Sequence, residues 1–341
     1  MEKRIEYIDI LRGLTMLLVV YSHVDIHLLG SVTPSALNSL FVSFRMPLFF
    51  FISGFFIYSE RYDLALLRRR TVNRLGRQFY PTLLFFLLYV VAVKPYSLKY
   101  YLYDPHKAGY WFTLVAVEYF LLVAPVLLML SNAGAGRRGR TLTLGILMAV
   151  AVAGDILMNE CTWIGKMPAV KLTSFPLFVR YMQYVLAGCM ARLWWPELRR
   201  SLFRIRMLPL YAALFAAGYL FAGRYVAWLT PYPAILLLLT SASLLPGSIY
   251  ATGCGRALTA TGTSTLEIYL MHYFIIRLLA GVSFLKNVLL PLRDTIWEFP
   301  AFMTVSVAVT AICVLTVGIF KRIRIYPLFF RPRMAWPAGI Q

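Results

Sequence analysis

The sequence predicts an all-α integral membrane protein with about ten membrane-spanning helices and both termini in the cytoplasm. Its 341 residues are 60% hydrophobic, with a mean hydropathy of +0.70, and only 14% are charged. A soluble domain carries roughly 25% charged residues, so this chain is too apolar to be one. Apolar runs of about 20 residues, each long enough to cross a bilayer, also recur along the whole chain.

A window of about 19 residues predicts ten spans, of which the third, fifth and eighth are short or interrupted. They lie near residues 10–30, 37–58, 78–94, 111–131, 141–158, 174–193, 206–223, 229–246, 263–284 and 301–320. No internal repeat is apparent between them. We therefore expect residues 1–341 to form a single polytopic membrane domain.

The net charge of +20 raises the question of a nucleic-acid partner. Its cations, however, fall in short clusters between the apolar runs, as topology signals and lipid contacts do. Of the 34 Lys and Arg, 22 lie at the termini and in the even-numbered loops, 8 in the opposite loops, and the remaining four within or beside spans. This bias predicts cytoplasmic termini, contact with membrane lipids and no nucleic-acid partner. The four cysteines are scattered, so we expect no metal site and no disulfide framework.

The first span contains Arg12, His23, Asp25 and His27. Ionisable groups within a bilayer are costly and mark a functional site by default. Arg12 and His23 are eleven positions apart, close to three helical turns, so they share one face about 16 Å apart along the axis. This geometry suits a long anionic ligand that enters from one side of the membrane.

The second span contains Ser53 and Gly54 within a run of phenylalanines. The glycine lets another helix or a ligand come close, and the serine can return its hydroxyl to the helix backbone. A Ser53 nucleophile activated by His23 is the alternative. A Gly-x-Ser-x-Gly elbow is missing, however, because Phe51 and Phe55 occupy the glycine positions.

Before the third span, Arg74 and Arg77 follow the cluster Arg68–Arg70. The cluster is typical of a topology signal that meets lipid head groups. Arg74 and Arg77 are three residues apart and would share a helix face, where two guanidinium groups can grip a phosphate.

Two later spans also carry polar groups. Trp111 and Glu118 are seven residues apart in the fourth span and stack on one face. Trp111 alone would be an interfacial anchor, but a carboxylate as deep as Glu118 needs a cation or a function. In the ninth span Tyr269 and His272 share a face, and His272 serves either as a helix-tethering group or in the site.

Five of these segments, taken in order, resemble the hallmarks of acyltransferase family three, membrane proteins that acylate sugars. They are Ile8–Gly13 with Val20–His23, Met46–Gly54 (MPLFFFISG), Arg74–Pro81, Trp111–Phe112 with Glu118–Tyr119, and Ser264 with Ile268–His272. The chain departs from the family in having Arg45 where a histidine is frequent, and Gly262 only two residues before Ser264.

The resemblance implies transfer of an acyl group, usually acetyl from acetyl-CoA, to a sugar hydroxyl outside the cytoplasm, within an envelope or exported glycan of a bacterium. The protein would then lie in the inner membrane. His23 would act as general base, contributing roughly 10² to 10⁴ in rate, and Asp25 or Glu118 would orient it. The remaining candidates divide into cytoplasmic donor-binding groups (Arg12, Arg74 and Arg77) and substrate-lining groups (Ser53, Gly54, Trp111, Tyr269 and His272).

Sugar recognition is expected in the tyrosine-rich loop 96–110 and in the loop 160–171. A transporter or flippase of a glycan-related solute is the alternative function, since buried Arg, His and Glu also suit a solute pathway. The missing inverted repeat counts against it.

Overall fold

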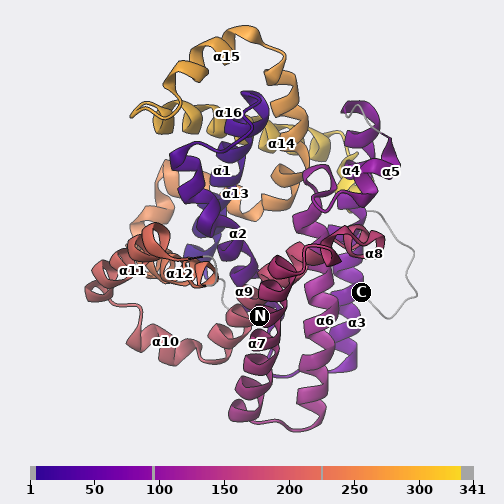
Figure 1. The fold of residues 1–341 in the computed structure, drawn as a ribbon, viewed down its shortest axis with the longest axis vertical. Coiled ribbons are helices and arrows are strands. Elements are labelled where there is room, and N and C mark those ends of the chain that lie inside the picture. The colour runs from indigo at the N-terminus through magenta and orange to yellow at the C-terminus, as the bar shows by residue number, and fades with distance from the viewer. Residues whose placement is uncertain (1–4, 94–96, 224–225, 332–341) are drawn as a thin grey trace. The chain divides into compact units, whose positions relative to one another are not determined.

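A computed structural model describes residues 5–93, 97–223 and 226–331. It is 84% helical, and the described residues include no strand (Figure 1). The predicted topology cations Lys3, Arg4, Lys94, Arg224 and Arg333, and Tyr96 of the predicted sugar-binding loop, lie outside the described residues.

Six helical segments of the described chain are long and apolar enough to cross a membrane. They are Glu6–Leu28 (α1, Glu6–His23, and the π-helical turn η1, Val24–Leu28), Ala36–Ile57 (α2), Leu64–Val93 (α3, Leu64–Arg74; η2, Leu75–Phe79; α4, Tyr80–Val93), Trp111–Asn132 (α6), Arg137–Glu160 (α7) and Glu298–Arg322 (α16). A seventh candidate consists of Thr265–Ala280 (α14) and Ser283–Leu292 (α15 and η8), which meet at a bend of 94°. The chain is therefore a helical, multi-pass membrane protein.

Three other helices coincide with the remaining predicted spans but are shorter or less apolar: Phe175–Leu193 (α9), Ile205–Phe221 (η5 and α11) and Ala227–Ser243 (η6 and α12). Each of the ten predicted spans thus overlaps a helix or a bent helix pair, while length and hydropathy identify six or seven candidate spans among the described residues. Ten remains a prediction. The connecting helices are Leu98–Tyr103 (α5), Pro168–Leu172 (α8), Trp195–Ser201 (α10), Gly253–Thr263 (α13) and Tyr326–Phe330 (α17), with the short 3-10 turns Lys107–Gly109 (η3), Ile164–Lys166 (η4) and Gly247–Ala251 (η7).

The helices form two compact units. Unit 1 comprises residues 1–49 and 196–323, and unit 2 comprises residues 50–195 and 324–341. In unit 1, α1 packs against α12, α13, α14 and α16. In unit 2, α7 lies along α9, and α6 packs against α3 and α9 (Figure 1).

Glycines bring helices into close contact in both units. A Cβ atom at Gly13 of α1 would lie 2.1 Å from the carbonyl oxygen of Leu258 in α13. In unit 2, a Cβ atom at Gly54 would lie 1.9 Å from the carbonyl oxygen of Val185 in α9, and one at Gly188 would lie 2.0 Å from that of Phe51. The close approach that we predicted at Gly54 is confirmed, and its partner is a helix, α9.

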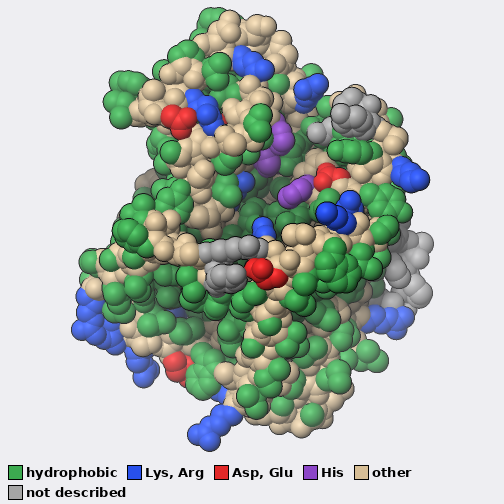
Figure 2. Space-filling view, viewed as in Figure 1, with side chains coloured by type: hydrophobic (Ala, Val, Ile, Leu, Met, Phe, Trp, Pro, Cys, Tyr) green, Lys and Arg blue, Asp and Glu red, His purple; other side chains and the backbone are tan. Residues whose placement is uncertain are grey.

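Hydrophobic side chains cover much of the surface in view (Figure 2). Large apolar residues on the spanning helices, such as Val91 at 80% and Leu315 at 67%, remain exposed. Water penalises such surfaces, but the hydrocarbon of a bilayer accommodates them. These helices therefore present lipid-facing sides.

Candidate active site

The predicted site residues divide between the two units. Unit 1 contains Arg12, His23, Asp25, Tyr269 and His272, and unit 2 contains Ser53, Gly54, Arg74, Arg77, Trp111 and Glu118. Each group is described within its own unit.

Arg12 and His23 lie on one uninterrupted helix, α1, as their spacing predicted. The helix starts with Glu6 and Asp9 in its first turn, where acidic side chains stabilise a helix N-terminus. Arg12 donates from Nη2 to Oγ1 of Thr265 at 2.9 Å, and its Nη1 lies 3.5 Å from Oδ1 of Asp9. His23 is the last residue of α1 before the backbone widens into the π-helical turn.

Four aromatic rings gather at this turn, two from the turn region itself and two from α14, about 250 residues later in the chain. The His23 and His27 rings stack with centroids 5.1 Å apart and an angle of 12° between their planes. His272 and Tyr273 of α14 approach the His23 ring with centroids at 5.1 and 4.7 Å. π turns inside helices are frequent at functional sites, and this one puts three histidine rings beside one tyrosine.

His272 is completely buried, and its ring is fixed. Nδ1 lies 3.0 Å from the carbonyl oxygen of Ile268. Because a carbonyl only accepts, Nδ1 carries the hydrogen. The helix-tethering bond that we predicted is thus present, and the same ring lies against His23. Tyr269 packs on His272 with centroids 5.7 Å apart.

Tyr273 makes the direct contact with His23: its hydroxyl oxygen lies 3.1 Å from Nε2. Sequence reasoning missed this residue. A signal was available, because Tyr273 follows His272 directly and lies four residues after Tyr269. A tyrosine ring in a span, however, is normally interpreted as a core-packing residue.

Asp25, predicted as one partner of His23, is fully buried and engaged elsewhere. Its Oδ1 accepts from Nε of Arg293 at 2.8 Å, and its Oδ2 accepts from the backbone N–H of Ser35 at 2.8 Å and from Nδ2 of Asn38 at 2.7 Å. The hydrogen bond that Arg293 donates to Asp25, together with the negative charge of Asp25, raises the pKa of Arg293. These contacts give Asp25 an anchoring role: it ties the π turn to the start of α2 and to the loop before α16.

A second buried carboxylate extends this anchor. Glu298 accepts from the hydroxyl of Tyr21 at 2.7 Å, from the hydroxyl of Ser35, and from the backbone N–H of Asp294 at 2.7 Å. Asn38 is oriented by Ser22, whose hydroxyl donates to its Oδ1. Buried polar groups with satisfied hydrogen bonds fix a unique packing, so the network defines the position of the turn that begins after His23.

In unit 2, Trp111 and Glu118 are both partly buried on α6. The Trp111 ring stacks on Tyr181 with centroids 5.4 Å apart and planes at 25°. The charge of Glu118 acts on Lys107, which supplies the cation that a carboxylate at this depth needs.

Lys107 joins the two loops in which we expect sugar recognition. Its Nζ donates to the carbonyl oxygens of Leu102, Asp104 and Lys171 at 2.7, 2.9 and 2.7 Å. Burial lowers the pKa of Lys107 to about 8, although Asp104 and Glu118 act in the opposite direction. Lys107 and Ala108 both have left-handed backbones, with φ of 49° and 52°. Such strain in non-glycine residues persists only where surrounding contacts impose it.

The arrangement of Arg74 and Arg77 differs from the shared α-helical face that we expected. A π-helical turn, Leu75–Phe79, starts directly after Arg74, so the regular α-helical face that would align them is interrupted. Arg74 is partly buried, with its guanidinium 4.8 Å from the centre of the Phe120 ring and Nη1 3.2 Å from Oε1 of Gln78. Arg77 is exposed. Of these two arginines, Arg77 therefore presents the more accessible guanidinium group.

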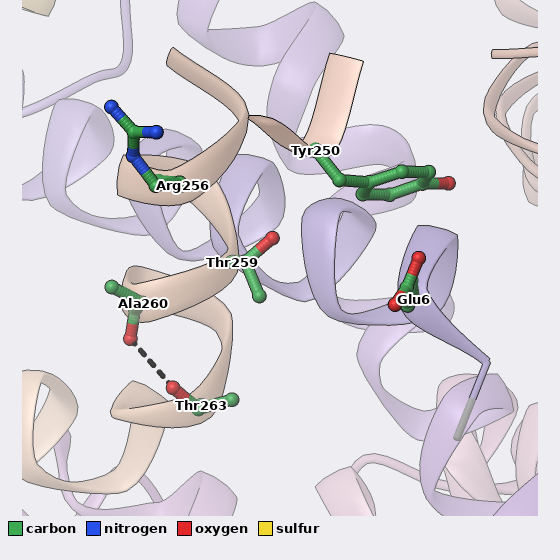
Figure 3. A pocket seen from close by; sticks show the side chains of 6 residues that line it. All are labelled: Glu6, Tyr250, Arg256, Thr259, Ala260 and Thr263. Atoms are coloured by element: carbon green, nitrogen blue, oxygen red, sulfur yellow. Dashed lines mark hydrogen bonds between the residues drawn. The ribbon is translucent and has the colours of Figure 1, made fainter. Parts of the chain in front are cut away.

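Unit 1 also has a pocket of about 370 Å³ beside the start of α1. It is lined by Glu6, Tyr250, Arg256, Thr259, Ala260 and Thr263. Tyr250 lies across from Glu6, and Arg256 points away from both (Figure 3). None of the predicted site residues lines this pocket.

Among the described residues, no group of three or more His, Cys, Asp or Glu has the geometry of a metal site.

The apolar spanning helices define a multi-pass membrane protein, and one of them carries both Arg12 and a histidine of the His23, His27 and His272 cluster. A family model described as an acyltransferase domain matches residues 5–315, so the chain belongs to acyltransferase family three and is a membrane acyltransferase. Comparisons with curated proteins and with solved structures gave no match.

Proposed function

We propose that this acyltransferase transfers an acetyl group from cytoplasmic acetyl-CoA to a sugar hydroxyl of an envelope or exported glycan, with His23 as general base. It does so in the inner membrane of a bacterium, as one domain of ten spans with both termini in the cytoplasm. The observation that carries the proposal is the imidazole of His23 on a spanning helix, where it is hydrogen-bonded to Tyr273 and packed against the ring of His272.

The proposed reaction needs one base and one path for the leaving group. The sugar oxygen attacks the thioester carbonyl carbon, its proton passes to the imidazole, and the C–S bond breaks to release the thiolate. A positioned base of this kind contributes roughly 10² to 10⁴ in rate. Asp25 and its network support the helix end that carries His23, while Glu118 belongs to the other unit and is proposed as an acceptor-side or orienting carboxylate.

Coenzyme A carries a pyrophosphate and a ribose phosphate, and arginine is the residue best suited to bind them. We assign this role to Arg12, Arg74 and Arg77, because the positive-inside bias puts them near the cytoplasmic side. Among them, the exposure of Arg77 fits direct contact with phosphate. Substitution of these arginines should raise the KM for acetyl-CoA more than that for the acceptor, and lysine should rescue only partly.

Recognition of the acceptor is proposed for unit 2, where Lys107 holds the loops around residues 97–110 and 160–171 together. Trp111 offers an aromatic surface, which sugars recognise through stacking of their C–H faces. Ser53, Gly54, Tyr269 and His272 are proposed to line the path of the substrates.

The test uses membranes that contain the full-length protein, [¹⁴C]acetyl-CoA as donor and the membranes' own glycans as acceptor. Alkali-labile label should appear in the glycan fraction with the wild type and be lost with His23→Ala. The variant should reach the same level in the membrane. Equal labelling with wild-type and empty membranes would refute acetyl transfer, and near-normal labelling with His23→Ala would refute the role of His23.

A further inference from the structure

The two ring nitrogens of His23 have different surroundings. Nδ1 is inaccessible to solvent and has no hydrogen-bond partner among the described residues. Nε2 lies 3.1 Å from the hydroxyl oxygen of Tyr273. A neutral imidazole has one N–H and one lone pair, so it can accept a proton at only one of these two atoms.

A general base must come within hydrogen-bond distance of the proton that it removes. No substrate atom can approach Nδ1 in this arrangement, because protein atoms cover it. At Nε2 the position of a hydrogen-bonding partner is already filled by Tyr273. A proton that passes from an acceptor hydroxyl to Nε2 along existing hydrogen bonds therefore goes through the tyrosine hydroxyl.

We infer that Tyr273 is a further catalytic residue, whose hydroxyl passes the proton of the acceptor to Nε2 of His23. This inference rests on the proposed function. In one step the acceptor O–H gives its proton to the Tyr273 oxygen, and Tyr273 gives its own proton to Nε2. The acceptor oxygen bonds to the carbonyl carbon and the C–S bond breaks. The proton then returns by the same path: the imidazolium gives its Nε2 proton to the Tyr273 oxygen and Tyr273 gives its own proton to the thiolate, which restores neutral His23 and yields free coenzyme A.

The surroundings of Tyr273 suit this role. A hydroxyl is both donor and acceptor, as a relay needs. The ring is 4% exposed and packs against His23, His27 and His272, with the His272 centroid 4.2 Å away. These contacts hold the phenol ring in place, so its hydroxyl can exchange protons without a change of rotamer.

The test compares Tyr273→Phe, His23→Ala and the control Tyr211→Phe in the [¹⁴C]acetyl-CoA assay. Tyr211 is another buried tyrosine of unit 1, and its hydroxyl donates to the carbonyl oxygen of Leu202 at 3.1 Å. We expect Tyr273→Phe to lower the rate of ester formation by about 10²-fold or more with little change in the KM for acetyl-CoA. Tyr211→Phe should keep the wild-type rate. In mixtures of H₂O and D₂O, a plot of the wild-type rate against the deuterium fraction should be curved, as expected when two protons move in the same step.

The inference is overturned if Tyr273→Phe keeps a rate within about twofold of wild type while His23→Ala is inactive, because His23 would then take the proton directly. If both variants are near normal, the proposed base itself is wrong. Should Tyr273→Phe fail to accumulate, replacement of Tyr273 by 3,5-difluorotyrosine retains the shape and makes the hydroxyl more acidic. A relay then predicts a pH–rate profile displaced to lower pH, and an unmoved profile overturns it.

Discussion

Lys107 is a buried cation, and the free energy that its burial costs the folded protein depends on pH. Its pKa in the folded protein is about 8, compared with 10.5 for an ordinary lysine. Between these two values the folded protein has lost the proton while the unfolded chain keeps it. The unfolded state therefore binds more protons, and the free energy of unfolding increases as pH rises through this window. Below pH 8 both states are protonated, and the burial penalty is fully present.

We therefore expect the unfolding temperature of the wild type in detergent to rise relative to that of Lys107→Met between pH 7.5 and 10, by a few degrees. Lys107→Met retains the length of the side chain and removes its titration. Lys99→Met, which alters an exposed lysine of the same loop, provides the matched control and should follow the wild type. Parallel curves for wild type and Lys107→Met would contradict the buried-lysine argument.

Single residues show which features of the site can be predicted from the sequence and which cannot. The position of His23 in a spanning helix, and its alignment with Arg12, follow from composition and helical period. The partners of His23 do not, because they depend on which helices meet. Tyr273 becomes recognisable only when α14 lies against α1, and Asp25 could be assigned to Arg293 only once the loop before α16 was placed.

At the level of elements, the π turn Val24–Leu28 is held by the Asp25–Arg293 pair. The Asp25 side chain is fully buried and that of Arg293 is 20% exposed, so removal of the carboxylate charge takes away the buried partner of Arg293. Arg293 then keeps only the Asp294 carboxylate, 48% exposed and 3.1 Å away, as a charged partner. Loss of one partner from a buried pair destabilises a protein by about 3–5 kcal/mol. We expect Asp25→Asn to lower both the unfolding temperature and the rate, the latter through kcat, because the turn that begins after His23 loses its anchor.

The matched control is Asp155→Asn in unit 2, where the carboxylate lies 3.5 Å from an Arg180 side chain that is 49% exposed. The Asp155 side chain is only 12% exposed, but Arg180 is open to solvent, so this variant should lower the unfolding temperature less than Asp25→Asn does. The double variant Asp25→Asn/Arg293→Gln should recover part of the stability that the single variant loses. Equal effects of Asp25→Asn and Asp155→Asn would show that the buried pair has no special role.

Helical periodicity predicts where helices occur better than it predicts their irregularities. The hydrophobic pattern located α1, α2 and α16, but it contains no sign of the two π turns or of the 94° bend after α14. These breaks arise from packing and hydrogen bonding between helices that are distant in sequence. The shared face expected for Arg74 and Arg77 failed for this reason, because it assumed a regular α-helix.

For the whole molecule, two native cysteines distinguish ten membrane crossings from six or seven. Cys161 follows α7, and Cys254 lies near the start of α13. Ten spans place α9, α11 and α12 across the membrane between them, which is an odd number of crossings. With six or seven spans, no crossing separates these cysteines. Ten spans with cytoplasmic termini predict that Cys161 faces outward and Cys254 faces the cytoplasm.

A membrane-impermeant maleimide should therefore label Cys161 in intact spheroplasts and Cys254 in inverted vesicles. Cys189 and Cys313 are buried and should react in neither preparation. Cys161→Ser and Cys254→Ser identify which thiol has reacted, and detergent-solubilised protein shows that both are accessible once the membrane is removed. Labelling of both thiols in the same preparation would support six or seven spans. It would leave α9, α11 and α12 without a crossing, and the positive-inside count for their loops would then need a different explanation.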